Sequence, residues 1–241
     1  MENNVGAMKA NPYKARFSDA PWFNKANKDY ALVLGAGGIG SNLIFLLSSI
    51  GVNMNIWDMD TVGTENIGQQ NFKYSQIGNS KVESIKNICI EFMGRDSHID
   101  TNNERYEASS PSNPIIFMGF GNMASRKLTY EKWVELLESI SEEERDEFFL
   151  IDGRLNFNQY QIFTVTKDNY KDYASTLVED SDIPDQPCTM KATRFASWGI
   201  VSDMVGIYLN WCTNKVYEDD DVAVVPFKVE KSYPNMYYKV E

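Results

Sequence analysis

The segment from residue 31 to residue 60 constrains the fold of this chain more than any other. Apolar residues 31–34 run directly into the stretch Gly35-Ala36-Gly37-Gly38-Ile39-Gly40, and apolar residues then recur at helical spacing over residues 43–47. A second apolar strand, residues 53–57, follows and ends in Asp58-Met59-Asp60. Strand, glycine turn, helix and strand in this order make a βαβ unit. The sequence therefore predicts an α/β protein with a Rossmann-like, doubly wound sheet.

The glycines of this unit also indicate a function. Gly35, Gly37, Gly38 and Gly40 would let the backbone turn tightly and approach a phosphate, while the following helix offers free N–H groups at its N-terminus. Asp58, at the end of the second strand, can accept hydrogen bonds from ribose hydroxyls. This context favours nucleotide binding over a glycine turn kept only for helix packing, but the glycines do not identify the nucleotide.

The rest of the chain fits a single domain of 241 residues. We divide it into an N-terminal arm (residues 1–29), a nucleotide-binding half (residues 30–150) and a substrate and dimerisation half (residues 151–241). The first half keeps alternating strands and helices, which is typical of a parallel sheet. The second half begins with a hairpin-like pair, so antiparallel strands are added there. The elements predicted after the βαβ unit are helices over residues 81–92, 124–140 and 194–211, and strands over residues 115–118, 148–151, 160–166 and 222–229.

Two of these helices carry informative apolar patterns. In helix 81–92, one face that includes Cys89 and Phe92 is expected to pack on the sheet. Residues 194–211 are apolar around nearly the whole circumference, so this helix is expected to be buried on all sides. In a domain of this size a second subunit is the expected cover for the extra face, which predicts a homodimer.

Composition excludes several classes of protein. The 34 acidic and 23 basic residues give a formal net charge of −11, which repels a phosphate backbone, so nucleic acid is not an expected partner. The longest apolar stretch, residues 39–50, is interrupted by polar residues and is too short to span a membrane. The N-terminus lacks the apolar run of a signal peptide. We expect a soluble, cytoplasmic protein with no membrane partner.

Sulfur and imidazole ligands are too few for a metal centre. The three cysteines, Cys89, Cys188 and Cys212, form no CxxC pair, which argues against a disulfide scaffold and against a four-thiolate zinc site. His98 is the only histidine and lies in a polar turn, so a histidine triad or metal cluster is excluded. Cys89 and Cys212 accompany apolar helix faces and are predicted to be structural. No residue is assigned as a metal ligand.

The residues after the second strand resemble the signature of a known family. The chain reads Asp58-Met59-Asp60-Thr61-Val62-Gly63-Thr64-Glu65-Asn66-Ile67-Gly68-Gln69-Gln70, then Ile77-Gly78-Asn79-Ser80-Lys81. This resembles the pattern DxDxVxxSNLxRQ followed by IGxxKA of the ThiF/MoeB superfamily, whose adenylating core is shared with ubiquitin-activating enzymes. The resemblance extends over residues 30–126, more weakly to residue 211, and looks closest to short ThiF-like proteins of bacteriophages.

The resemblance implies a reaction and its cofactors. ATP, with Mg²⁺, would be attacked at its α-phosphate by the C-terminal carboxylate of a small ubiquitin-like or sulfur-carrier protein. The products would be an acyl-adenylate and pyrophosphate. Such a reaction depends on positioning and charge stabilisation, with little covalent chemistry from the protein. The nucleotide-binding residues carried over by position are Gly35, Gly37, Gly38, Gly40, Asp58, Asp60, Asn66, Gln69, Gln70 and Lys81, with Asp58 at the ribose and Lys81 at the phosphate oxygens.

The chain departs from the family pattern at two positions that matter. Gln69 stands where the family has an arginine that contacts the phosphates, and Gly121 stands where it has the aspartate that serves magnesium. Asp60, Arg126 or Arg154 could substitute, and Arg16 loosely resembles an N-terminal arginine that family dimers lend across their interface. Gln70, Asn122 and Arg126 do match the family. A catalytically degenerate nucleotide-binding or interaction module is therefore the alternative to an enzyme.

Lys81, Arg126 and Cys188 are the candidate catalytic residues. Cys188 precedes the apolar helix, and it is either a thiol that accepts the acyl group or a small apolar residue of a loop. Asp152 and Arg154 follow a predicted strand; they either bind the carboxylate tail or pair with each other. A third reading, an NAD-dependent dehydrogenase, needs a catalytic His or Tyr/Lys pair that we do not find.

Overall fold

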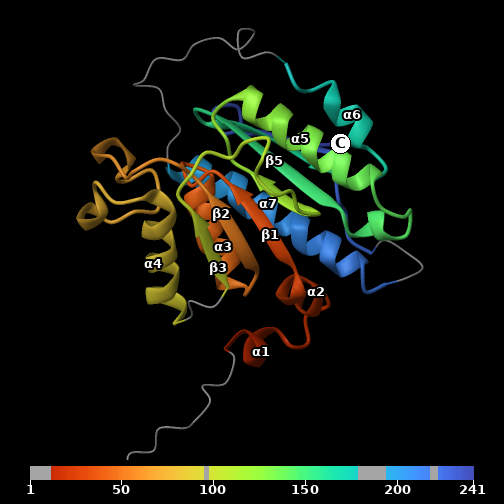
Figure 1. Ribbon diagram of the computed structural model, residues 1–241, viewed down its shortest axis with the longest axis horizontal. Helices are drawn as coiled ribbons and strands as arrows, with labels where there is room; N and C mark the ends of the chain where they lie inside the picture. The colour runs from red at the N-terminus through yellow and green to blue at the C-terminus, as the bar shows by residue number, and fades with distance from the viewer. Residues whose placement is uncertain (1–11, 95–97, 179–193, 218–221) are drawn as a thin grey trace, which may run out of the picture.

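The computed structural model of the chain describes residues 12–94, 98–178, 194–217 and 222–241. These residues form a central sheet between layers of helices (Figure 1). Eight strands in these residues form one sheet in the order β3-β2-β1-β4-β5-β6-β7-β8. The strands are β1 (Tyr30–Leu34), β2 (Asn53–Trp57), β3 (Ile99–Asn102), β4 (Ile115–Met118), β5 (Phe149–Asn156), β6 (Gln159–Val165), β7 (Lys228–Ser232) and β8 (Tyr237–Val240).

The direction of the strands changes halfway along the sheet. The pairs from β3 to β5 are parallel, whereas the pairs β5–β6, β6–β7 and β7–β8 are antiparallel. β2 and β4 lie on opposite sides of β1, so the sheet has a switch point at the carboxyl ends of β1 and β4, where open α/β sheets bind ligands. The predicted Rossmann-like fold, with antiparallel strands added in the second half, is confirmed.

The central strands β1 and β4 are buried on both faces of the sheet, and successive residues of each strand point to opposite faces. Ala31 and Val33 of β1 belong to one core, whereas Leu32 and Leu34 belong to the other. Helices α3, α4 and α7 pack into the first core and α5 and α6 into the second; α5 and α7 accordingly lie on opposite sides of the sheet in Figure 1. The helices are α1 (Pro12–Phe17), α2 (Phe23–Lys28), α3 (Gly40–Ser49), α4 (Lys81–Met93), α5 (Met123–Glu138), α6 (Tyr170–Ala174) and α7 (Arg194–Asn214), with short 3-10 turns at Thr64–Asn66, Tyr74–Gln76 and Glu144–Glu147.

The chain itself covers α7, which weakens the argument for a dimer. The helix packs against α2, α3 and the sheet, and the hydroxyl of Tyr208 donates to Asp29 at 2.8 Å. The exposed positions of α7 form a narrow strip that includes Phe195, Ser202 and Gly206. Burial on all sides was therefore wrong for this strip, and a second subunit is not needed to bury the rest of the helix.

Three further expectations were wrong in detail. Phe92 is 67% exposed, because the last turn of α4 places its ring edge-on against Phe45 of α3 rather than on the sheet. Strand β3 follows His98 and was missed, since this edge strand holds a single apolar residue. The closing strand begins at Lys228 rather than residue 222 and is followed by β8, whose exposed side chains carry little apolar alternation.

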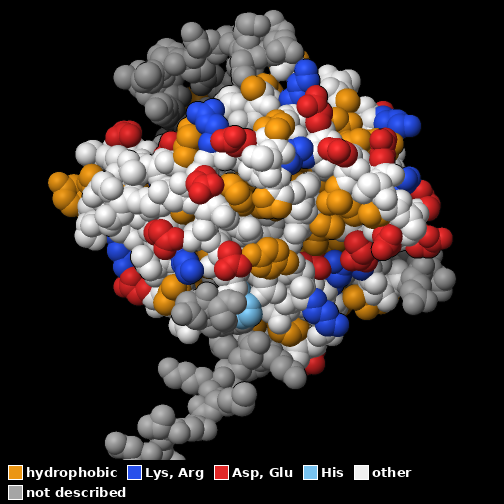
Figure 2. All heavy atoms as spheres, viewed as in Figure 1, with side chains coloured by type: hydrophobic (Ala, Val, Ile, Leu, Met, Phe, Trp, Pro, Cys, Tyr) orange, Lys and Arg blue, Asp and Glu red, His pale blue; other side chains and the backbone are white. Residues whose placement is uncertain are grey.

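Charge is mixed over the visible surface. On the face drawn in Figure 2, lysine and arginine side chains are interspersed with aspartate and glutamate side chains. Among the described residues, no helix is both long and apolar enough to cross a membrane.

Candidate nucleotide and carboxylate site

The glycine loop joins β1 to α3 and depends on glycine for its shape. Gly35 adopts a φ of +94°, a left-handed conformation that other residues rarely adopt. A Cβ atom at Gly40 would overlap the carbonyl oxygen of Gly35, whereas a Cβ atom at Gly37 would meet no atom within 4 Å. Gly40 therefore allows the first turn of α3 to approach the end of β1, and Gly37 faces open space.

This difference predicts that an alanine at Gly40 lowers stability, whereas an alanine at Gly37 weakens ATP binding. Gly40→Ala should lower the free energy of unfolding by more than about 2 kcal/mol, because backbone atoms must move to admit the methyl group. Gly37→Ala should change that free energy by less than about 0.5 kcal/mol but weaken ATP binding, because the methyl group would occupy phosphate space. Urea unfolding and ATP titration measure the two effects. Equal ATP affinity in Gly37→Ala and the unsubstituted chain would contradict the placement of the phosphates.

Asp58 holds the glycine loop from the end of β2. Its Oδ2 accepts a hydrogen bond from the N–H of Ala36 at 2.6 Å, and its Oδ1 accepts from the N–H of Asp60 at 2.8 Å. Carboxylate oxygens carry two lone pairs each, so acceptor capacity remains for a ribose. The sequence predicted the ribose role of Asp58, and the structure adds the contact with the loop.

Lys81 lies in the first turn of α4, with only 7% of its surface exposed. The side-chain ammonium of Lys81 is 2.8 Å from a carboxylate oxygen of Asp60. The backbone N–H of Lys81 donates to the backbone carbonyl of Asp60 at 3.0 Å. Asn66, also buried, accepts from the N–H of Gly63 at 2.8 Å and thereby shapes the turn between β2 and α4. The residues predicted from the family signature thus meet around the carboxyl ends of β1 and β2.

Two clefts meet at this edge of the sheet. The smaller, of about 240 Å³, is lined by Gly35, Asp58, Asp60 and Lys81 together with aromatic side chains that include Trp57 and Tyr106. The larger, of about 1000 Å³, extends over the second half of the sheet. Both share one wall, which consists of Gly37, Gly119, Phe120 and Gly121.

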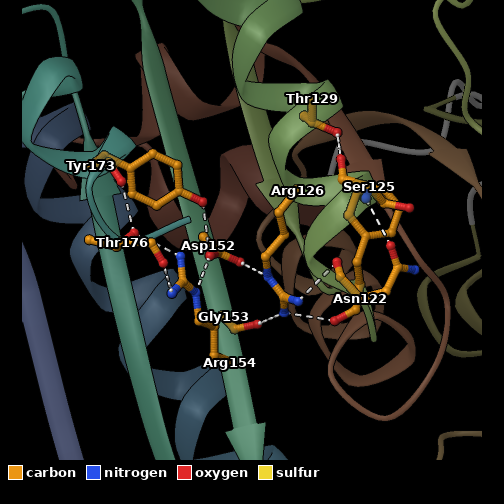
Figure 3. Close-up of polar contacts among 10 residues, drawn as sticks. Asn122, Ser125, Arg126, Thr129, Asp152, Gly153, Arg154, Tyr173 and Thr176 are labelled. Carbon is orange, nitrogen blue, oxygen red and sulfur yellow. Dashed lines mark hydrogen bonds and ion pairs between the residues drawn. The ribbon is translucent and has the colours of Figure 1, made fainter. Parts of the chain in front are cut away.

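A buried charge cluster borders the larger cleft (Figure 3). Asp152, with no exposed surface, accepts from Nε of Arg126 at 2.8 Å, from Nε of Arg154 at 2.6 Å and from the hydroxyl of Tyr173 at 2.9 Å. Burial opposes ionisation of Asp152, but the two guanidinium groups outweigh it and hold its pKa below the ordinary value. Of the two readings of Asp152 and Arg154, the ion pair is therefore present.

Arg126 shapes the shared wall. One of its terminal nitrogens donates to the carbonyls of Phe120 at 2.7 Å and Gly153 at 3.1 Å, and the other donates to that of Asn122 at 3.3 Å. These contacts tie the loop after β4 to β5. Arg126, 5% exposed, therefore fixes the backbone of that loop, and its catalytic role stays a prediction.

The other predicted site residues fall into three groups. Gln69 and Gln70 line the larger cleft, and the amide of Gln69 lies beside Gly38. Arg16 is exposed on α1, with its guanidinium over the ring of Phe17, and it does not line either cleft. Cys188 lies outside the described residues.

The two described cysteines are buried. Burial raises the pKa of Cys89 to about 11 and that of Cys212 to about 12, so neither thiol is reactive near neutral pH. This agrees with their predicted structural role.

Sequence analysis missed two parts of the site. Gly119 and Phe120 follow a predicted strand, and their place at its carboxyl end was the available signal. Tyr173 and Thr176, which hold Asp152 and Arg154, follow β6 in the chain and carry no local motif.

Comparisons with known proteins give a family for part of the chain and a shared fold. Residues 14–128 match the model of the ThiF family. No curated protein matches the chain. Among solved structures, E. coli MccB with ATP superposes with a TM-score of 0.62 at 11% identity, over 92% of this chain and 65% of that chain.

Two other structures give similar results. E. coli MccB with AMPCPP and MccA has a TM-score of 0.64 at 12% identity, over 92% of this chain and 65% of that one. PaaA has a TM-score of 0.69 at 13% identity, over 100% of this chain and 77% of that one. These likenesses concern the fold, and the chain spans about 65% of the length of the two MccB chains. The sequence match identifies a ThiF family domain over residues 14–128, and the solved structures share the fold of the chain.

Proposed function

We propose that this chain uses ATP to adenylylate a C-terminal carboxylate of a small protein or peptide. Ubiquitin-like and sulfur-carrier proteins are the expected substrates. The meeting of two clefts at the glycine loop carries the proposal, because a nucleotide in one cleft and a carboxylate in the other would come together there. MccB, which shares the fold, has been solved with ATP and, in another structure, with AMPCPP and MccA.

The smaller cleft suits the nucleoside. The rings of Trp57 and Tyr106 offer apolar contact for adenine, and Asp58 offers acceptors for ribose hydroxyls. The phosphates would follow the backbone of Gly37 toward the N-terminus of α3, whose free N–H groups favour anions. Lys81 would exchange part of its contact with Asp60 for phosphate oxygens.

The chemistry is a displacement at phosphorus. A carboxylate oxygen forms a bond to the α-phosphorus while the bond from that phosphorus to the bridging oxygen of the β-phosphate breaks. Pyrophosphate leaves with the electron pair, and no proton has to move. The ammonium of Lys81 and the helix N-terminus stabilise the charge that gathers on the phosphoryl oxygens.

A protein-bound magnesium ion fits this site poorly. Within the described part of the chain, no three His, Cys, Asp or Glu side chains are grouped to hold a metal ion. Gly121 occupies the shared wall, and Asp60 is paired with Lys81. Mg²⁺ can bind through nucleotide phosphates with few protein ligands, so the proposed mechanism assigns no step to a protein-held ion.

Introducing a carboxylate at position 121 tests this reasoning. A Cβ atom there meets no atom within 4 Å, so Gly121→Asp should fold normally and place a ligand beside the phosphates. We expect the Mg²⁺-dependent rate to rise by about 10-fold or more. Gly206→Asp is the matched control, since this exposed position on α7 is equally open and lies outside both clefts. An equal change in both variants, or a slower Gly121→Asp protein, contradicts the assignment of the wall.

The proposed activity is tested by pyrophosphate exchange. The chain is incubated with ATP, Mg²⁺ and labelled pyrophosphate, with and without candidate carrier proteins that have a free C-terminus. Carrier-dependent label in ATP is the expected result, and ATP but not NADH should raise the melting temperature. Silence with every carrier, despite ATP binding, would count against the enzyme.

A catalytically degenerate binding module is the second candidate. Gln69 and Gly121, which replace charged residues of the family pattern, favour it. In that case binding of the partner protein would survive Lys81→Ala, and Gln69→Arg with Gly121→Asp would restore no turnover. Loss of biological activity in Lys81→Ala would exclude the module.

Two finer points also belong to the proposal. We propose a homodimer and a cytoplasmic location. Light scattering tests the dimer, because it measures the mass of the particle in solution.

Cys188 is proposed either as an acyl acceptor or as a loop residue. Mass spectrometry of the chain after incubation with ATP and a carrier distinguishes the two by the presence of a thioester.

A further inference from the structure

Residues 119–122, which we call the β4 loop, supply most of the wall that separates the two clefts. Two of these four residues are glycines, and a Cβ atom at Gly121 would meet no atom within 4 Å. Glycine leaves the backbone conformationally free, so side-chain packing does little to fix this loop. Contacts from neighbouring elements have to fix it instead.

The position of the β4 loop matters because the loop lies against the glycine loop. A Cβ atom at Gly119 would lie 3.3 Å from the backbone nitrogen of Gly40 and 3.5 Å from the Cβ atom of Ile39. The N–H of Gly119 donates to the carbonyl of Leu34 at 2.9 Å. In the proposed complex, the β4 loop therefore sets where an α-phosphate above Gly37 would meet the larger cleft.

Arg126 holds the β4 loop with nearly all of its hydrogen-bonding capacity. Its guanidinium makes four hydrogen bonds, with the carbonyls of Phe120, Asn122 and Gly153 and with the carboxylate of Asp152. A guanidinium has five N–H groups, so at most one is left for a ligand. The orientation of this guanidinium then decides where two carbonyls of the β4 loop lie.

Tyr173 and Asp152 in turn fix the guanidinium of Arg126. Oδ1 of Asp152 accepts from Nε of Arg126 at 2.8 Å, and Oδ2 accepts from the hydroxyl of Tyr173 at 2.9 Å. Figure 3 shows the contacts running from Tyr173 through Asp152 and Arg126 to Asn122. Both Tyr173 and Asp152 are fully buried, and neither occurs among the described residues that line the two clefts.

We infer that Tyr173 and Asp152 are positioning residues of the adenylylation site. The inference rests on the proposed function and adds residues that act on it without touching a ligand. Tyr173 orients the carboxylate of Asp152, Asp152 orients Arg126, and Arg126 holds the β4 loop where the α-phosphate would meet the attacking carboxylate. Misplacing reacting groups by about 1 Å can lower a rate by about 100-fold, so a remote hydroxyl can control turnover.

Two phenylalanine variants form a matched pair for testing this. Tyr173→Phe removes only the hydroxyl that donates to Asp152. Tyr130→Phe is the control, because its ring lies 5.3 Å from the ring of Tyr173 and its hydroxyl donates to the carbonyl of Tyr170 at 2.8 Å. Each variant loses one hydroxyl and one hydrogen bond beside α6, but only Tyr173→Phe removes a contact of Asp152. Urea unfolding checks that both variants fold.

Amide hydrogen exchange, measured by NMR on the free chains, reports the position of the β4 loop without requiring activity. The N–H of Gly119 and that of Ser125, which donates to the side chain of Asn122 at 2.8 Å, bracket the loop. Both should exchange at least about 5-fold faster in Tyr173→Phe and at an unchanged rate in Tyr130→Phe.

Pyrophosphate exchange separates positioning from binding. In Tyr173→Phe, kcat should fall by about 10-fold or more, whereas KM for ATP should change by less than about 3-fold. Most of the proposed nucleotide contacts come from the glycine loop, Asp58 and Lys81, which explains the small effect on KM. In Tyr130→Phe both constants should stay unchanged.

A double variant tests whether the contacts act in sequence. Arg126→Lys keeps a cation beside Asp152 but loses the planar fork that holds the two carbonyls of the β4 loop. If Tyr173 acts through Arg126, adding Tyr173→Phe to Arg126→Lys should not speed amide exchange further. Additive effects of the two substitutions would show that they act independently and would overturn the inference.

The remaining outcomes distinguish this inference from the proposed function. Equal amide exchange in the two phenylalanine variants, or an unchanged kcat in Tyr173→Phe, overturns the inference. Faster exchange confined to Tyr173→Phe, with no pyrophosphate exchange in the unsubstituted chain, supports the link from Tyr173 to the β4 loop and contradicts the enzyme instead.

Discussion

Replacing Lys81 with alanine should lower the rate of pyrophosphate exchange by about 100- to 1000-fold, which is the typical cost of losing one preorganised charge contact in a transition state. In the proposed complex, the ammonium of Lys81 lines the smaller cleft from the first turn of α4 and is already oriented by a carboxylate oxygen of Asp60 at 2.8 Å. The alanine variant also leaves Asp60 near the phosphates without a counter-charge.

Two variants separate charge from structure at this position. Lys81→Arg keeps the charge and should retain more activity than Lys81→Ala. Lys86→Ala, on the same helix but outside both clefts, should behave as the unsubstituted chain. Exchange rates and ATP affinities give the comparison. Normal exchange in Lys81→Ala would contradict the role assigned to the ammonium.

The largest expected effect on stability comes from Asp152→Asn. Removing this carboxylate leaves two guanidinium groups, 5% exposed in Arg126 and 14% in the side chain of Arg154, without their anion. Breaking a buried ion pair from one side typically costs about 3–5 kcal/mol. Urea unfolding should show a loss of this size. Glu230→Gln, which removes a more exposed carboxylate from a pair with Lys228, should cost less than about 1 kcal/mol.

The same carboxylate predicts a pH dependence. The pKa of Asp152 is lower in the folded chain than in the unfolded chain, so its contribution to stability is complete above the unfolded value. That contribution is lost as the pH falls through the folded value. The difference in unfolding free energy between the unsubstituted chain and Asp152→Asn should therefore shrink in acid. A difference that stays constant down to acidic pH would contradict the ion pair as its cause.

The first βαβ unit was predictable because its signals are local. A short stretch of the sequence holds the two apolar strands, Gly35 between them and Asp58 at the end of the second strand. Each of these signals can be recognised from its near neighbours in the sequence. Lys81 was predictable for the same reason, because it ends the short motif at residues 77–81 that follows the glycine loop in the family pattern. The hydrogen bond from the N–H of Ala36 to Asp58 was not predictable, since it depends on how β2 ends beside the loop.

The larger cleft depends on contacts between distant parts of the chain. Arg154, Gln161 and Glu230 line this cleft from three different strands. They lie level with one another only because of the register of β5, β6 and β7. No local pattern gives that register. The same reason applies to α7. Its apolar circumference is visible in the sequence, but the segments that cover it, α2, α3 and the sheet, are not, because no local pattern shows which segments pack together.

A crystal structure with a non-hydrolysable ATP analogue tests the central claim most directly. The account predicts ribose hydroxyls within hydrogen-bond distance of Asp58, phosphates over Gly37 within reach of Lys81, and an α-phosphate at the wall formed with residues 119–121, open to the larger cleft. A nucleotide bound elsewhere, or one whose α-phosphate is closed off from the larger cleft, would contradict it.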